Sequence, residues 1–175
     1  MKKLAAFAAV LFSVFSTFAL PDGFSKIHLG MSLDELKSEL KKDLQFCYRG
    51  DRDVSLSPSD GQILIETDAS GADYSFLDRC YFQFADEKLY IITINMKNSK
   101  IDHYSIFSKL CEKYGQPKEL NPNKSLWQDS SVIMTLERPL TLKYVDAKSF
   151  KDKKDKSNIE KTTGEKARDA FLDSL

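Results

Sequence analysis

Few residues of this chain are suited to metal binding or to nucleophilic catalysis. Only two histidines and three cysteines occur among its 175 residues. The cysteines show no Cys-x-x-Cys spacing and the histidines no His-x-x-His spacing, so neither a thioredoxin-like redox site nor a zinc site is supported. We therefore expect no catalytic residue, no metal site and no cofactor, and a protein that is not an enzyme.

Glycine and proline are also scarce, and neither sign of charge dominates. Seven Gly and five Pro exclude a collagen-like or proline-rich chain. The 26 basic and 26 acidic residues balance, which gives no reason to expect a nucleic-acid partner. Hydrophobic residues make up 42%, which suffices for a packed core and excludes a wholly disordered chain. The length fits one main domain.

The first 19 residues have the layout of a secretory signal peptide. Lys2 and Lys3 form a positive start, Leu4 to Phe15 is an apolar run, and Thr17-Phe18-Ala19 resembles a small-x-small cleavage site. The apolar run is short for a membrane span, which needs about 20 residues. An uncleaved N-terminal anchor is the alternative. We expect residues 1–19 to be removed, no membrane span after cleavage, and a periplasmic or secreted protein.

Two helices are signalled by their ends. Ser32 and Glu35 have the spacing of a capping box, which predicts a helix that ends near Asp43. Asp102 can cap a second helix, and Gly115 is a good C-terminal stop for it.

The segments between and after these helices show period-two patterning, which is typical of strands with one face on a core. Strands are predicted at 46–48, 62–67, 80–84, 90–96, 126–127, 132–136 and 140–144. The order predicts an α+β fold, with an antiparallel sheet whose helices pack on one face. The domain spans 20–146, and its pattern suggests a tandem α-β-β-β repeat with units at 24–97 and 98–146.

The composition changes at the end of the chain. Residues 147–175 form a charged tail, and its mixed run at 151–156 is of the kind that is usually solvated. The sequence 162–165 could cap a short C-terminal helix, which would be marginal in water unless it docked on something.

The three cysteines, Cys47, Cys80 and Cys111, leave two alternatives. In an oxidising compartment one disulfide and one free thiol can form, and Cys47–Cys80 is the preferred pair because both residues fall in strand-like segments. The alternative, slightly favoured, is three buried thiols that act as small hydrophobes.

For the other candidate site residues we prefer a structural interpretation to a functional one. His28 or His103 could pair with a cysteine for catalysis, but His103 and Cys111 lie about 12 Å apart along one helix. Asp51, Asp53 and Asp60 could suggest calcium, but their spacing does not match an EF-hand loop, so solvated turn acids are expected.

Leu29-Gly30-Met31 lacks the pattern of a phosphate loop, and Gly30 is expected to turn the chain into the helix. Trp127 could stack on a glycan or a peptide, but its place in a strand favours the core.

Two short stretches resemble known exported domains. Residues 27–36, Ile-His-Leu-Gly-Met-Ser-Leu-Asp-Glu-Leu, are similar to the opening of outer-membrane assembly lipoproteins of the SmpA/OmlA type. Residues 113–117, Lys-Tyr-Gly-Gln-Pro, followed by Trp127, resemble a helix end and first strand in such domains and in tandem β-lactamase-inhibitor-like folds. The resemblance implies helices on a sheet, and it transfers no functional residue. The chain lacks the lipidation cysteine of the lipoproteins.

Together these features predict an exported, non-enzymatic binding or assembly module of the bacterial cell envelope. Its partner would be another envelope protein, met on a sheet face, a sheet edge or the C-terminal helix. The alternative is a small periplasmic hydrolase or ligand carrier, which would show a deep apolar pocket with converging polar groups. The sequence does not predict the oligomeric state.

Overall fold

The computed structural model describes residues 19–50, 53–57, 62–68, 73–155, 168 and 171–174, with the backbone alone for 53–57. The expected signal peptide therefore lies almost wholly outside the described residues. The elements before the second long helix are β1 (Gly23–Phe24), β2 (Ile27–His28), α1 (Leu33–Lys42), the 3₁₀ helix η1 (Leu44–Phe46), β3 (Asp53–Ser57), β4 (Gln62–Glu66), β5 (Tyr81–Ala85) and β6 (Lys88–Asn95). The later elements are α2 (His103–Tyr114), β7 (Glu119–Leu120), β8 (Lys124–Gln128), β9 (Val132–Glu137) and β10 (Thr141–Asp146).

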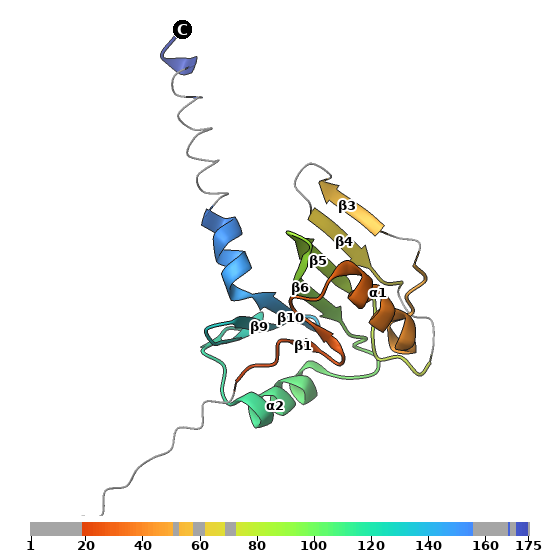
Figure 1. Ribbon diagram of the computed structural model, residues 1–175. Coiled ribbons are helices and arrows are strands. Elements are labelled where there is room, and N and C mark those ends of the chain that lie inside the picture. The colour runs from red at the N-terminus through yellow and green to blue at the C-terminus, as the bar shows by residue number, and fades with distance from the viewer. Residues whose placement is uncertain are drawn as a thin grey trace, which may run out of the picture.

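Eight strands form one antiparallel sheet in the order β3-β4-β5-β6-β10-β9-β8-β7, and β1 and β2 form a small hairpin. Each helix is followed by a four-stranded meander, and the last strands of the two meanders, β6 and β10, pair at the centre (Figure 1). The α+β class is confirmed. The large sheet has two edge strands that the sequence did not predict, β3 on one side and β7 on the other.

The strand registers show that both helices lie on the same face of the sheet. One row of paired residues crosses six strands, and it consists of Ile65, Phe82, Ile92, Tyr144, Met134 and Trp127. Phe46, just after α1, packs against Phe82 at 5.9 Å between ring centroids, and Phe107 of α2 packs against Trp127 at 6.1 Å. Since paired residues in neighbouring strands share a face, α1 and α2 cover the same side. The apolar side chains beneath them form one continuous core through both units.

The predicted helix ends are confirmed. The Ser32 side chain accepts a hydrogen bond from the Glu35 N–H, and the Glu35 carboxylate accepts one from the Ser32 N–H at 2.8 Å. The Asp102 carboxylate accepts a hydrogen bond from the Ser105 N–H at 2.9 Å, and α2 stops at Gly115, whose φ is 77°. Such ends depend only on neighbouring residues, and for that reason sequence alone predicts them well.

The strand predicted at 46–48 is wrong. The Asp43 carboxylate accepts a hydrogen bond from the Gln45 N–H at 3.1 Å and starts the turn of η1 there. Cys47 then has a left-handed backbone with φ of 50°, so the chain cannot continue as a strand. Phe46 is still buried, but it reaches the core from a helical turn.

The chain after β10 continues as a helix over residues 147–155, which the composition did not indicate, and the charged positions 151, 152, 154 and 155 of this helix are exposed. The Asp146 carboxylate accepts a hydrogen bond from the Ser149 N–H at 2.7 Å, which caps the first turn. The Lys153 ammonium lies 5.3 Å from the centre of the Tyr90 ring, a cation–π contact that ties this helix to the sheet. The short helix expected after residues 162–165 falls largely outside the described residues.

Asp129 sits in the β8–β9 turn and should make part of the stability pH-dependent. Partial burial raises its pKa, but hydrogen bonds from the N–H groups of Val132, Ser131 and Leu20 outweigh this and hold the pKa below its usual range. A lowered folded-state pKa stabilises the fold above the unfolded-state pKa of about 4. That contribution is lost as pH falls through the lower folded-state value.

We therefore expect chemical denaturation to show a loss of stability below about pH 4 that Asp129→Asn reduces. The matched control is Asp155→Asn, which removes an exposed acid outside this turn. Parallel pH profiles for the wild type and Asp129→Asn would contradict the assignment.

Candidate functional site

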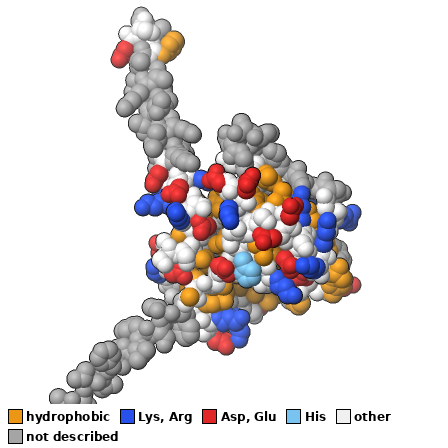
Figure 2. Space-filling view, in the orientation of Figure 1, with side chains coloured by type: hydrophobic (Ala, Val, Ile, Leu, Met, Phe, Trp, Pro, Cys, Tyr) orange, Lys and Arg blue, Asp and Glu red, His pale blue; other side chains and the backbone are white. Residues whose placement is uncertain are grey.

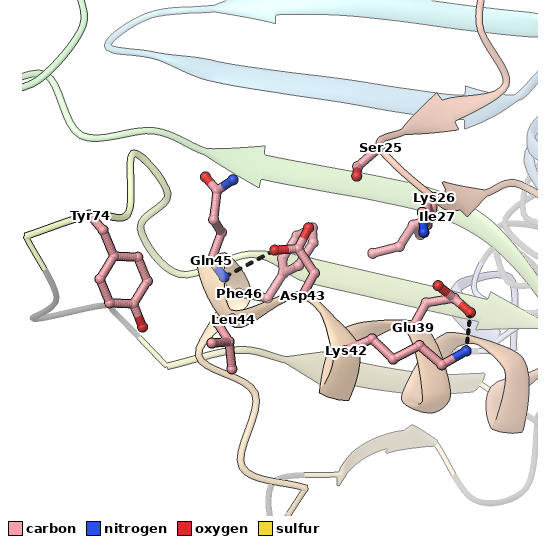
Figure 3. Close-up of a pocket in the computed structure, with 10 residues that line it drawn as sticks. All are labelled: Ser25, Lys26, Ile27, Glu39, Lys42, Asp43, Leu44, Gln45, Phe46 and Tyr74. Atoms are coloured by element: carbon pink, nitrogen blue, oxygen red, sulfur yellow. Dashed lines mark hydrogen bonds and ion pairs between the residues drawn. The ribbon is translucent and has the colours of Figure 1, made fainter.

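A hollow on the helix-covered side lies where α1 passes into η1. It has a volume of about 500 Å³, within the range of small-molecule and side-chain pockets. Its walls come from the β1–β2 turn, the end of α1, η1 and the loop that carries Tyr74 (Figure 3). We call this hollow the Leu44 groove, and its lining residues are Ser25, Lys26, Ile27, Glu39, Lys42, Asp43, Leu44, Gln45, Phe46 and Tyr74.

The groove has a buried apolar floor and an exposed apolar rim. Phe46 and Ile27 are each only 1% exposed and belong to the core. Leu44 is 71% exposed and Tyr74 is 60% exposed. Large apolar side chains on a concave surface are a common mark of a contact site.

A break in the helix places Leu44 on this rim. Leu36, Leu40 and Leu44 follow the four-residue spacing of a single buried stripe, and the first two are fully buried in α1. The helix ends at Asp43, so the chain turns before Leu44 can join that stripe. The sequence reasoning missed the groove because it placed a strand at 46–48, where the structure has the end of η1 and a left-handed turn at Cys47.

The loop that carries Tyr74 is held by hydrogen bonds on both sides. The buried Ser75 hydroxyl donates to the Gln45 carbonyl at 2.8 Å, which ties the loop to η1. The Lys97 ammonium donates to the Ser75 carbonyl at 3.3 Å, and the Lys100 ammonium donates to the Asp73 carbonyl. Tyr74 is thus presented from an anchored backbone, which limits the entropy lost when a partner binds.

The acidic groups of the groove are already engaged within the chain. Glu39 forms an ion pair with Lys42 at 2.6 Å, and this hydrogen bond lowers the pKa of the Glu39 carboxyl. The Asp43 carboxylate caps η1 at Gln45. The groove therefore presents an apolar surface whose carboxylates are already engaged, which suits an apolar side chain of a partner.

The histidines and cysteines considered from sequence do not come together. The His28 imidazole is 2.8 Å from the Asp22 carboxylate. His103 starts α2, and the Cys111 thiol lies 3.9 Å from the Gln116 side-chain oxygen. Within the described part of the chain, no three His, Cys, Asp or Glu side chains cluster as metal ligands would.

The other candidates lie as follows. Asp51 and Asp60 are outside the described residues, and Asp53 is described by its backbone alone. Gly30 has a φ of 85° and turns the chain toward α1 as predicted. Trp127 is 2% exposed, and its indole N–H donates to the Gly115 carbonyl at 2.8 Å, which confirms its place in the core.

All three cysteines are free thiols in the structure, and no Cys47–Cys80 disulfide is present. Cys80 is fully buried, and burial raises the pKa of its thiol to about 12. Cys47 lies at the end of η1 and not in a strand, which removes the reason for preferring that pair. Burial also raises the pKa of the half-buried Cys111 thiol.

A thiol count should separate the two alternatives for the cysteines. In unreduced, denatured protein we expect three reactive thiols, and in native protein at pH 8 we expect Cys80 to stay unmodified because it is buried and protonated. Iodoacetamide labelling with peptide mass spectrometry measures both. One reactive thiol in the denatured sample, with a linked Cys47–Cys80 peptide, would establish the disulfide.

Comparison with known protein families gives a match over most of the chain. A family model described as the TP0088 domain matches residues 22–156. The chain belongs to the TP0088 domain family. The matched region of this TP0088 domain contains both helix–meander units, the Leu44 groove and helix 147–155. No curated protein and no solved structure matches the chain.

Among the residues that the structure describes, no helix has the length and apolarity needed to span a bilayer. Figure 2 shows acidic and basic side chains interspersed with apolar ones over the visible face of the TP0088 domain.

Proposed function

We propose that this TP0088 domain is an exported, non-enzymatic binding module of the bacterial cell envelope that acts through protein–protein contacts. The observation that carries the proposal is the Leu44 groove, where two large exposed apolar side chains border a core-lined hollow. Binding energy at interfaces is concentrated in a few apolar and aromatic anchor residues, and one such side chain of a partner can bind in this groove. The signal-like residues 1–19 support a periplasmic or secreted location.

The proposed partner is another envelope protein, and its anchor is an apolar side chain that fills the groove. The resemblance of residues 27–36 to outer-membrane assembly lipoproteins supports a role in envelope assembly. The engaged state of Glu39 and Asp43 favours docking over acid–base chemistry at this site, because neither carboxylate faces the hollow uncommitted. The alternative function, a small hydrolase or a ligand carrier, would need the Glu39 and Asp43 carboxylates to converge on a bound molecule.

Site-specific photo-crosslinking in envelope-containing cells tests the proposal. The full chain would carry a photo-reactive residue at position 44 or 74, or at Phe150 as the control. Phe150 is also exposed, at 45%, but lies on helix 147–155. We expect a discrete cross-linked protein from positions 44 and 74 and none from 150.

Sequencing of the purified chain should give Leu20 as the first residue if the signal is removed. Equal cross-linking from all three positions would contradict docking at the groove. A tightly held small molecule in native mass spectra, with no cross-linked protein, would favour the ligand carrier instead.

A further inference from the structure

A second hollow lies at the far end of the sheet, and it differs from the Leu44 groove in its charge. Two adjoining cavities of about 440 Å³ and 610 Å³ share Asp102, His103 and Arg138. They lie between the start of α2, the turn before β8 and the β9–β10 turn. We call them together the Arg138 cleft.

Arg138 is held in a fixed position beside the cleft. Its backbone N–H donates to the Asn123 carbonyl at 2.9 Å, and its side-chain Nε–H donates to the Pro122 carbonyl at 2.8 Å. A guanidinium has five N–H donors, and the structure gives the remaining four no partner among the residues it describes. A positioned guanidinium of this kind suits a carboxylate, which can accept two parallel hydrogen bonds.

The other ionisable groups leave the cleft with an excess of positive charge. Arg138 and Lys124 are its cations, and Asp102 is the acid among its described lining residues. Both Asp102 oxygens are engaged by Ser105, at 2.9 Å from the N–H and 2.6 Å from the hydroxyl. Burial lowers the pKa of His103 and the nearby Arg138 lowers it further, against the opposing effect of Asp102, and the lowered pKa favours the uncharged imidazole.

The other end of the cleft is apolar and borders a sheet edge. Tyr104 is 74% exposed and Leu120 is 66% exposed, and Phe107, which also lines the cleft, packs against the core. Leu120 belongs to β7, which pairs only with β8 and is the last strand of the sheet. An edge strand offers backbone hydrogen-bonding groups to an added extended chain.

We propose that the Arg138 cleft binds the C-terminal end of an extended peptide whose last residue is apolar. The terminal carboxylate lies on the Arg138 guanidinium, and the last side chain lies between Tyr104 and Leu120. The peptide residue before the last one forms backbone hydrogen bonds with the exposed edge of β7. This site is separate from the Leu44 groove and does not depend on the function proposed for it. The edge strand favours a peptide over a fatty acid, because a fatty acid has no backbone to pair with β7.

Titration of the isotopically labelled, purified chain by NMR tests this site. The probes are acetyl-Ala-Val-Leu with a free carboxylate, the same peptide with a C-terminal amide, and octanoate. We expect the free acid to bind at least tenfold more tightly than the amide, with shift changes at residues 103–107, 120–123 and 138. A charge-assisted hydrogen bond to the guanidinium accounts for that ratio.

Variants assign the contacts within the cleft. Arg138→Gln should remove the difference in affinity between the free-acid and the amide peptide. Lys118→Gln, which removes an exposed cation that does not line the cleft, should preserve that difference. Leu120→Ser changes an exposed position that the fold does not need, and it should weaken the binding of both peptides several-fold. This variant keeps the test valid if Arg138→Gln misfolds. Equal binding of acid and amide, or tighter binding of octanoate than of the peptide, would overturn the proposal.

Discussion

Replacing Phe82 with alanine is expected to lower the free energy of unfolding by about 3–5 kcal/mol. Phe82 is fully buried in β5 and packs edge-on against Phe46. The loss combines the transfer free energy of the ring with the cost of the cavity that it leaves. Because a domain is typically stable by about 5–15 kcal/mol, this single change could halve its stability.

The same variant tests whether the two units form one cooperative core. Trp127 is the sole tryptophan of the chain and lies in β8 of the second unit, whereas Phe82 lies in the first. If the continuous core couples the units, Trp127 fluorescence and circular dichroism should both shift to the same lower denaturant midpoint. The control Phe171→Ala, at a residue 64% exposed, should shift neither. An unchanged fluorescence midpoint beside an earlier dichroism transition would mean that the units unfold separately.

Replacing Leu44 or Tyr74 with aspartate is expected to abolish capture of the envelope partner. An anchor residue at an interface contributes about 2–4 kcal/mol, and a buried unpaired charge adds a desolvation cost to that loss. The dissociation constant should therefore rise by about 30-fold to 1,000-fold. Both side chains are more than half exposed, so the fold itself should tolerate the changes.

The measurement is the affinity of the purified chain for the cross-linked partner, once that partner is identified. The matched control, Phe150→Asp, introduces the same charge at another exposed large apolar residue and should retain full affinity. Thermal unfolding of each variant checks that it is folded. A folded Leu44→Asp variant with unchanged affinity would rule out the groove as the contact site.

Elements with local signals were predictable from the sequence. The capping box at Ser32 and the Asp102 cap of α2 depend on residues three positions apart, so their chemistry is visible in the chain itself. The strand predicted at 90–96 corresponds to β6, which lies at the centre of the sheet between β5 and β10. The same reasoning missed η1 and helix 147–155, where a single aspartate side chain redirects the backbone.

The candidate site depends on contacts that no local pattern contains. Leu44 continues the spacing of the buried leucines of α1, so its sequence position predicts burial, and only the end of the helix at Asp43 exposes it. Tyr74 reaches the same rim through Ser75, which is bound to Gln45 thirty positions earlier in the chain. Arg138 comes beside His103 through the pairing of β8 with β9 and the bond to Pro122.

Composition, periodicity and capping chemistry were thus enough to establish the α+β class, the ends of both long helices and most strands. Each of these follows from the preferences of adjacent residues and from the two periods of helix and strand. Only the tertiary structure decided the order of the strands across the two units, the exposure of Leu44 and the assembly of both hollows. These features arise from hydrogen bonds and packing between residues far apart in the chain, which the spacing of side chains along it does not encode.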